Sequence, residues 1–176
     1  MKIRDDAWII SDTHFGHGNI IKYAGRPFPS AAVMDRSLVQ KWNAAVKQKD
    51  QVIFLGDFSF GNAEETVDYR KSLNGQIIMV MGNHDRGRSA DWWKNVCGME
   101  EVFDCPIIFK DFFILSHEPV EWVSERLPVL NIHGHTHEKT VYNMTNHHFN
   151  VSVEVIGYRP MPLAAIIEEG RRLSSL

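Results

Sequence analysis

Short apolar runs of strand length recur along the chain, and polar residues of the types that bind metal ions follow five of them at once. Runs of four or five residues rich in Ile, Val and Phe are typical of buried strands. The five predicted strands are Ala7–Ser11, Val52–Leu55, Ile77–Met81, Phe112–Ser116 and Val129–Ile132. The polar residues that follow them therefore mark five strand ends.

Two helices are predicted between the early strands. One covers Ser30–Lys47 and opens with a serine suited to cap it, and the other covers Asn62–Leu73 and stops before Gly75. The alternation of strand and helix predicts an α/β sheet with parallel connections in the first half of the chain. Because ligands bind beyond the carboxyl ends of such strands, we expect the polar clusters to meet at one edge.

The second half of the chain shows short apolar segments separated by tight turns, which favours a more antiparallel sheet packed on the first. Its predicted strands are Glu100–Phe103, Cys105–Phe109, Phe112–Ser116, Phe149–Ile156 and Leu163–Ile167. The expected fold class is α/β, with two packed mixed β-sheets flanked by helices in an α-β-β-α sandwich. With 176 residues and no repeat or linker, we expect one domain over residues 1–176.

The composition excludes several classes of protein. A hydrophobic content of 44% supports a folded core and excludes a disordered chain. The net charge of −3 gives no general attraction to nucleic acid or to an anionic membrane. The apolar run Ala7–Ile10 is too short for a signal peptide or a membrane span, so a cytoplasmic protein is expected. Cys97 and Cys105 form no metal-binding pair and are expected to be reduced, buried thiols.

Carboxylate, amide and imidazole side chains stand at the strand ends, and these are ligands of Mn²⁺, Fe and Zn²⁺. The candidate ligands are Asp12, His14, Asp57, Asn83, His117, His135 and His137. Seven ligands are too many for one zinc ion, but they fit two ions if one carboxylate bridges them. Two ions about 3.5–4 Å apart lower the pKa of a shared water to give a hydroxide nucleophile and clamp phosphate oxygens. The sequence therefore predicts phosphoester hydrolysis.

The same residues form a series of motifs: Asp12-x-His14, Gly56-Asp57, Gly82-Asn83-His84-Asp85, His117 and Gly134-His135-x-His137. This series resembles the calcineurin-like metallophosphoesterase superfamily, with every block in order. The longer string from Asp12 to His17, Asp-Thr-His-Phe-Gly-His, resembles a branch of small single-domain bacterial and phage phosphoesterases. Phe58-Ser59-Phe60 follows Asp57 where the Ser/Thr protein phosphatases have Asp-Arg-Gly, so a phosphoprotein substrate is not expected.

The resemblance implies a role for each motif residue. Asp12, His14, Asp57 and His137 would hold the first ion, and Asp57, Asn83, His117 and His135 the second, with Asp57 as the bridge. His84 would protonate the leaving oxygen as general acid. Asp85 would orient a neighbouring group. Two divalent transition-metal ions are expected, Mn²⁺ first, with Fe²⁺, Zn²⁺, Ni²⁺ and Co²⁺ as other candidates.

Several further residues have two interpretations. His17, Arg26 and Arg86 are candidates for contact with a phosphate, and their alternatives are a loop stabilised by side-chain bonds or a solvated surface. Asn150 and Glu154 are candidates to support the ligand histidines. The tryptophans either stack on a nucleobase or pack in the core: Trp92, Trp93 and Trp122.

The expected substrate is a small phosphodiester or a nucleotide-type molecule, and a phosphodiesterase is favoured over a monoesterase. Two alternatives remain. One is a non-catalytic metal-binding scaffold or assembly module, against which the presence of His84 argues. The other is a nuclease acting on RNA or DNA, which the net charge of the chain does not favour.

Overall fold

The structure is a computed structural model that describes residues 2–110, 113–121, 129–139 and 147–174, with side chains described up to residue 168. The helices are α1 Gly18–Tyr23, α2 Ala31–Ala45, α3 Ala63–Ser72, the 3₁₀ turn η1 Asp85–Gly87, α4 Ala90–Asn95 and α5 Leu163–Ser174. The strands are β1 Trp8–Ile10, β2 Gln51–Phe54, β3 Gln76–Val80, β4 Glu101–Phe103, β5 Ile107–Phe109, β6 Phe113–Leu115, β7 Leu130–His133, β8 His148–Asn150 and β9 Met161–Pro162.

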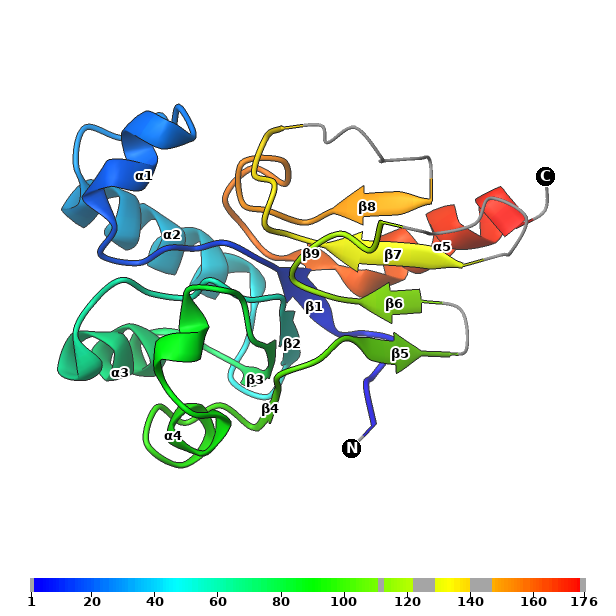
Figure 1. The fold of residues 1–176 in the computed structure, drawn as a ribbon, viewed down its shortest axis with the longest axis horizontal. Helices are drawn as coiled ribbons and strands as arrows, with labels where there is room; N and C mark the ends of the chain where they lie inside the picture. Colours follow the sequence, from blue (N-terminus) through cyan, green and yellow to red (C-terminus); the bar gives the residue numbers. More distant parts are fainter. Residues whose placement is uncertain (1, 111–112, 122–128, 140–146, 175–176) are drawn as a thin grey trace.

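The strands form two mixed sheets. The first has five strands in the order β4-β3-β2-β1-β9, in which β1 to β4 run parallel and β9 is antiparallel to β1. The second has four strands in the order β5-β6-β7-β8. In Figure 1, β1 to β4 stand in the middle, with α1 to α4 on one side and β5 to β8 on the other. The predicted fold class, two mixed sheets with flanking helices, is confirmed.

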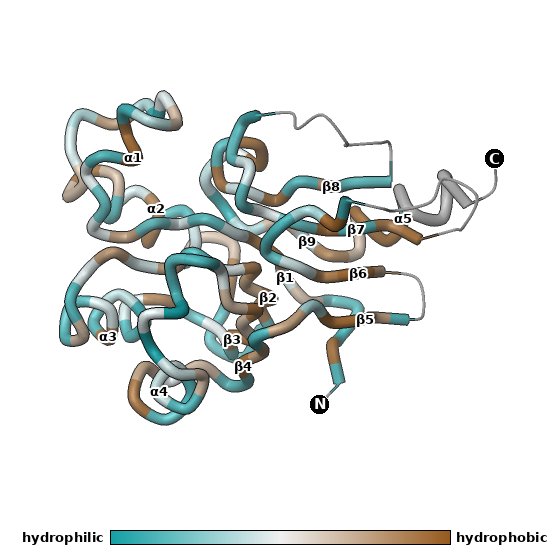
Figure 2. Tube along the Cα trace, viewed as in Figure 1, coloured by the Kyte–Doolittle hydropathy of each residue, from teal (hydrophilic) through white to brown (hydrophobic). Residues whose placement is uncertain are grey.

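The molecule has two hydrophobic cores, one on each face of the central strands, and successive residues of these strands pack alternately into one core and the other. On β2, Val52 and Phe54 pack with α2 and α4, whereas Ile53 faces the second sheet. The same alternation occurs on β3, where Met79 packs with the helices and Ile78 packs between the sheets. Figure 2 shows hydrophobic residues concentrated along β2, β3 and β6. Strands buried on both faces explain why these runs carry few polar residues.

The two predicted helices are confirmed as α2 and α3, and each begins at a capping residue. The Ser30 hydroxyl accepts a hydrogen bond from the backbone N–H of Val33. Asn62 and Glu65 form a capping box, in which each side chain accepts from the backbone of the other. The short helices α1 and α4 were not predicted, because six residues carry too little periodicity to be recognised.

The second half of the chain corrects three predictions. Glu100–Phe103 does not join the second sheet; β4 pairs in parallel with β3 in the first sheet. The second sheet is mainly parallel, because β6-β7 and β7-β8 are parallel and β5-β6 is its antiparallel pair. Leu163–Ile167 starts helix α5 and is not a strand. A run of five apolar residues cannot by itself distinguish a strand from a buried helical turn.

The predicted strand Phe149–Ile156 is also too long, since β8 ends at Asn150 and the chain then turns. The turn has a consequence for the site, because it carries Ser152 and Glu154 towards the ends of β1 and β7. Of the two cysteines, Cys97 is buried as expected, but Cys105 is exposed. Within the described ranges, no helix is long and apolar enough to cross a bilayer.

Candidate metal centre

The carboxyl ends of strands from both sheets converge in one region of the molecule. Parallel strands β1, β2 and β3 bring the ends of the first sheet to one edge. Parallel strands β6 and β7 do the same for the second sheet, and their arrowheads point towards the same region in Figure 1. A bridge between Ser11 and Ser152 joins the two edges. The predicted meeting of the polar clusters at one edge is therefore what the fold produces.

Six of the candidate ligands form two groups in which the ligand atoms lie within 4.8 Å of one another. The first group contains Asp12, His14 and His137. The second contains Asp57, His117 and His135. Asn83 joins the second group, because its Oδ1 atom lies 2.9 Å from His117 Nε2 and 3.1 Å from His135 Nδ1.

Asp57 lies between the two groups. Its Oδ2 atom is 3.5 Å from His14 Nε2 in the first group and 3.5 Å from His117 Nε2 in the second. Two ligands of one tetrahedral ion, each bonded at about 2.1 Å, lie about 3.4 Å apart. Asp57 is therefore at ligand spacing from both groups, as a carboxylate that bridged two ions would be.

Hydrogen bonds to the protein fix which nitrogen of two histidines faces the centre. The His117 Nδ1 atom lies 2.7 Å from the carbonyl oxygen of Leu55, and His137 Nδ1 lies 2.9 Å from Glu154 Oε1. Each Nδ1 must carry a hydrogen to donate to these oxygens, so the neutral ring has its lone pair on Nε2. In His117 that lone pair faces the Asn83 amide oxygen at 2.9 Å, and a cation bound by both atoms would satisfy these two acceptors.

Buried polar atoms without partners give a second test of whether a metal ion fits. Within the described part of the chain, Asp12 Oδ1 and His14 Nε2 are buried and make no hydrogen bond. The other carboxylate oxygen of Asp12 accepts from the His135 backbone N–H and from the Ser152 hydroxyl. A buried carboxylate oxygen left unpaired is costly, and coordination to a cation would satisfy it. The donor set therefore fits divalent metal ions.

The titration of the carboxylates reflects the crowding of charge. Burial and the neighbouring charge of Asp12 raise the pKa of Asp57 to about 7. Burial lowers the pKa of His14 to about 4, which keeps its imidazole neutral and able to coordinate. A cation placed between two carboxylates removes their repulsion, so binding of a metal ion favours the ionised form of Asp57.

Backbone strain is concentrated at the candidate ligands. Among the described residues, Asp12, His14, Asp57, His135 and His137 have φ values between 50° and 66°. Residues with side chains rarely adopt this left-handed conformation, and it is retained where the surrounding structure requires it. The strained backbone at these five residues directs their side chains into one small volume.

The glycines of the motifs allow close approach between the loops. A Cβ atom at Gly82 would collide with the carboxylate of Asp57, and one at Gly134 with that of Asp12. A Cβ at Gly56 would collide with the backbone of Gly82. Any larger residue would therefore push the loops apart and separate the ligands.

Asp85 holds the loops after β2 and β3 together. Its buried carboxylate accepts hydrogen bonds from the backbone N–H groups of Asp57 at 2.6 Å, Gly82 at 2.8 Å and Phe58 at 3.0 Å. Burial and the charge of Asp57 raise the pKa of Asp85 to about 6, against the effect of these bonds. Asp85 thus holds the backbone that carries Asp57, and it belongs to neither group of candidate ligands.

Arg26 lies behind the first group and does not face solvent. It is 3% exposed, and its guanidinium donates to Glu154 Oε1 at 2.7 Å and to the carbonyl oxygens of Asp12 and Thr13. The same Glu154 oxygen accepts from His137. A buried chain Arg26–Glu154–His137 therefore orients one candidate ligand. The guanidinium of Arg26 is therefore buried and paired, which does not support the interpretation that Arg26 contacts a phosphate. Asn150 supports the same loop by donating to the His137 carbonyl at 2.7 Å.

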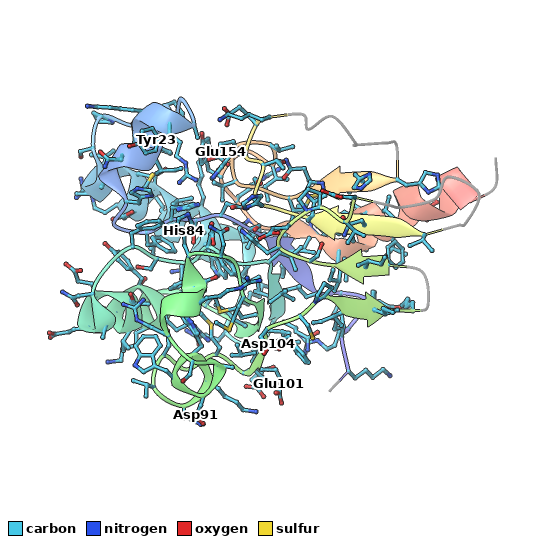
Figure 3. All side chains as sticks on the ribbon, viewed as in Figure 1. Tyr23, His84, Asp91, Glu101, Asp104 and Glu154 are labelled. Carbon is cyan, nitrogen blue, oxygen red and sulfur yellow. The ribbon has the colours of Figure 1, made fainter. Side chains whose placement is uncertain are left out.

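His84 stands at the mouth of the centre. Its backbone N–H donates to Asp57 Oδ1 at 3.0 Å, its Nε2 lies 3.9 Å from Asp57 Oδ2, and its side chain is 46% exposed. Burial and the charge of His117 lower its pKa. In Figure 3, His84 is seen with Tyr23 of α1 and Glu154 on the helix-rich side of the molecule.

The remaining predicted residues are placed differently. His17 lies beside the first group, with Nδ1 3.4 Å from His14 Nδ1 and its ring stacked on Phe60. Arg86 is exposed on η1 and does not line the pocket beside His84. Trp93 is fully buried and donates to the Asp85 carbonyl, which fits the core interpretation. Trp122 lies outside the described residues.

Sequence reasoning missed Ser152, Tyr23 and Phe60. Ser152 falls inside the predicted strand Phe149–Ile156 and belongs to no motif, so nothing in the sequence links it to Asp12. Phe60 comes three residues after Asp57, a weak signal at best. Tyr23 is brought to the centre by α1, which was not predicted.

Comparison with known proteins gives three findings. Residues 6–152 match the family model described as the calcineurin-like phosphoesterase superfamily domain. An uncharacterized protein of Methanocaldococcus jannaschii is 37% identical over 169 residues, which cover 92% of this chain and 89% of that protein. A crystal structure of a protein of unknown function from Aquifex aeolicus is similar with a TM-score of 0.68 and 28% identity, over 92% of this chain and 97% of that one.

Proposed function

Because the chain belongs to the calcineurin-like phosphoesterase superfamily, whose members are metal-dependent, we propose that it is a phosphodiesterase that uses two divalent metal ions. The observation that carries the proposal is the position of Asp57 at ligand spacing from both candidate groups. Two ions bound there would supply an activated water and positive charge for the transition state. Mn²⁺ is the proposed metal, since oxygen and imidazole ligands without thiolate suit it.

Each ligand has a proposed place. Asp12, His14, Asp57 and His137 would hold the first ion, and Asp57, Asn83, His117 and His135 the second. The hydrogen bonds of His117 to Leu55 and of His137 to Glu154 keep Nε2 of each ring available. Asp85 and Glu154 hold the loops and rings in place before substrate arrives, which lowers the cost of ordering the site.

His84 is the proposed general acid. Its ring is at the mouth of the centre, within reach of a phosphate oxygen held between the two groups, and its backbone is tied to Asp57. Proton transfer to an alkoxide leaving group contributes about 10²–10⁴-fold to rate. A phosphate bound beside the ring would favour its protonated form, because the negative charge stabilises imidazolium.

A diester is the proposed substrate because the pocket beside the first group offers little net positive charge. Its lining contains the cation Lys139 together with the anion Glu138, and Arg26 is buried in its pairing with Glu154. A monoester carries up to two negative charges and a diester one, so a pocket whose charged side chains add no net positive charge to that of the ions favours the diester.

The test is hydrolysis of bis(4-nitrophenyl) phosphate by protein stripped of metal and then supplied with Mn²⁺, Fe²⁺, Co²⁺, Ni²⁺ or Zn²⁺. We expect turnover that depends on added metal and a lower rate with 4-nitrophenyl phosphate. A chain that binds two ions but hydrolyses neither ester would be a metal-binding scaffold, and the proposal would fail. Preference for the monoester would overturn the diester assignment alone.

A further inference from the structure

A pocket of about 430 Å³ opens between α1 and the candidate metal centre. His14, His84 and His137 line one side of it, and Asn19 and Tyr23 of α1 line the other. Pockets of 300–1,000 Å³ are the usual size of small-molecule sites. A substrate whose phosphate lies between the two ligand groups would therefore extend its organic part into this pocket.

Exposed aromatic rings gather at this pocket. Among the described residues, Tyr23 is 69% exposed and Phe60 is 41% exposed, and the other exposed large hydrophobic side chains are aliphatic. Both aromatic rings line this pocket. Exposed aromatic side chains that converge beside a reactive centre indicate binding of a ligand, because leaving them in water has a cost.

The rings form a continuous wall from His84 to α1, which we call the aromatic wall: His84, Phe60, His17 and Tyr23. The ring centroids of Phe60 and His84 are 4.6 Å apart, and Phe60 stacks on His17 at 3.7 Å with an interplanar angle of 16°. Tyr23 meets His17 edge-on, with centroids 6.4 Å apart. Successive rings are tilted against one another, so a planar group could stack on an exposed ring of this wall, Tyr23 or Phe60, while the phosphate attached to it stays beside His84.

The polar lining indicates that the planar group is uncharged. Glu138 and Lys139, of opposite sign, stand at the rim, and both are exposed. Asn19 is exposed in the lining, and its side-chain amide can both donate and accept hydrogen bonds. An uncharged ring with donors and acceptors on its edge matches this lining better than a second phosphate group or an alkyl chain.

The geometry points to a nucleobase-binding subsite formed by the aromatic wall and Asn19, so that the substrate is a nucleotide phosphodiester. This inference rests on the proposed function for the place of the phosphate, and it adds the class of the ester. Stacking of a base on aromatic side chains is sequence-tolerant, so purine and pyrimidine esters are both accepted.

The experiment compares a matched pair of substrates, the methyl phosphodiesters of adenosine 5′-phosphate and of ribose 5-phosphate, the second of which has a hydroxyl at C1 in place of the base. With the metal-loaded protein, we expect kcat/KM to be about 5- to 150-fold higher for the adenosine ester, the range that corresponds to stacking of one base. Tyr23→Ala should remove most of this ratio, and Tyr23→Phe should keep it, since the ring and not the hydroxyl stacks. Ile108→Ala, an exposed aliphatic side chain on β5, is the control and should change nothing.

Binding provides a readout that does not depend on turnover. Calorimetry with adenosine 5′-phosphate and ribose 5-phosphate should give a tighter Kd for the nucleotide by a similar factor, again reduced by Tyr23→Ala. Equal kcat/KM for the two diesters together with equal Kd for the two monophosphates would exclude the nucleobase subsite. That result would not contradict the proposed phosphodiesterase activity. A clear binding preference without hydrolysis would support the subsite and defeat the proposed function.

Discussion

His117 and His137 each use one ring nitrogen for the protein and leave the other for the centre. The carbonyl of Leu55 and the carboxylate of Glu154 determine which nitrogen is free. At this scale the sequence located the candidate ligands, six of which the structure brings into two groups, because Asp, Asn and His at strand ends have few structural reasons to cluster. It also named Glu154 as a candidate to support a ligand histidine. It could not name Leu55, an ordinary apolar residue that acts through its backbone carbonyl.

His84→Ala should retain the metal ions and lose rate. We expect about a 10²–10⁴-fold lower kcat on a dialkyl phosphodiester, whose alkoxide needs a proton, and a much smaller loss on a 4-nitrophenyl ester. Steady-state kinetics on both esters, with metal content measured for each preparation, checks this prediction. Equal losses on the two esters would exclude the acid role.

Glu154→Gln should weaken metal binding although Glu154 is not itself a candidate ligand. The substitution leaves buried Arg26 without its counter-charge and weakens the hydrogen bond that orients His137. Supporting groups of this kind contribute about 10–100-fold to metal affinity. Competition with a chelator should show this loss, together with a lower Tm. Glu64→Gln, on the exposed first turn of α3, is the matched control. An unchanged metal affinity in Glu154→Gln would show that Glu154 does not support the metal site.

The two cysteines should differ in reactivity. Burial raises the pKa of the Cys97 thiol to about 12, so this group stays protonated up to strongly alkaline pH, while Cys105 is exposed. Because the thiolate is the reactive form, iodoacetamide at pH 8.5 should add once to the native protein and twice in urea. Mass spectrometry counts the adducts. Rapid double modification of the native chain would show that Cys97 is accessible.

At the scale of elements, apolar runs of strand length located β1, β2, β3 and β7 and therefore the edge where the site forms. The segment Leu163–Ile167 predicted a strand because its five residues are all apolar, but the buried residues Leu163, Ile166 and Ile167 have the spacing of one helix face. Strand β4 was assigned to the wrong sheet, since its pairing with β3 depends on the crossover through α4, which was not recognised. Pairing across the chain is a tertiary property that short segments do not encode.

Asp85→Asn should loosen the connection between the loops after β2 and β3. An amide nitrogen would face backbone N–H groups that now share one carboxylate, so at least one donor loses its partner. We expect a loss of about 2–4 kcal/mol in the free energy of unfolding, measured by urea denaturation. Asp91→Asn, on the exposed first turn of α4, should cost less than about 0.5 kcal/mol. Equal stabilities of the two variants would contradict the role given to Asp85.

At the scale of the whole molecule, two sheets are needed to make one centre. The first sheet contributes Asp12, His14, Asp57 and Asn83, and the second contributes His117, His135 and His137. The hydrophobic core between the sheets therefore sets the distance between the two halves of the ligand set. Binding of metal ions across this junction should stabilise the packing of the sheets on one another, because ions that bind only the folded chain favour it.

The most direct measurement is the number and position of metal ions in protein crystallised with Mn²⁺, by anomalous scattering together with elemental analysis. We expect two ions per chain, one on each side of Asp57, at a separation of about 3.5–4 Å. Asp57→Asn should lower the number of bound ions. One ion per chain, or two ions without a contact to Asp57, would contradict the claim that this carboxylate joins two metal sites.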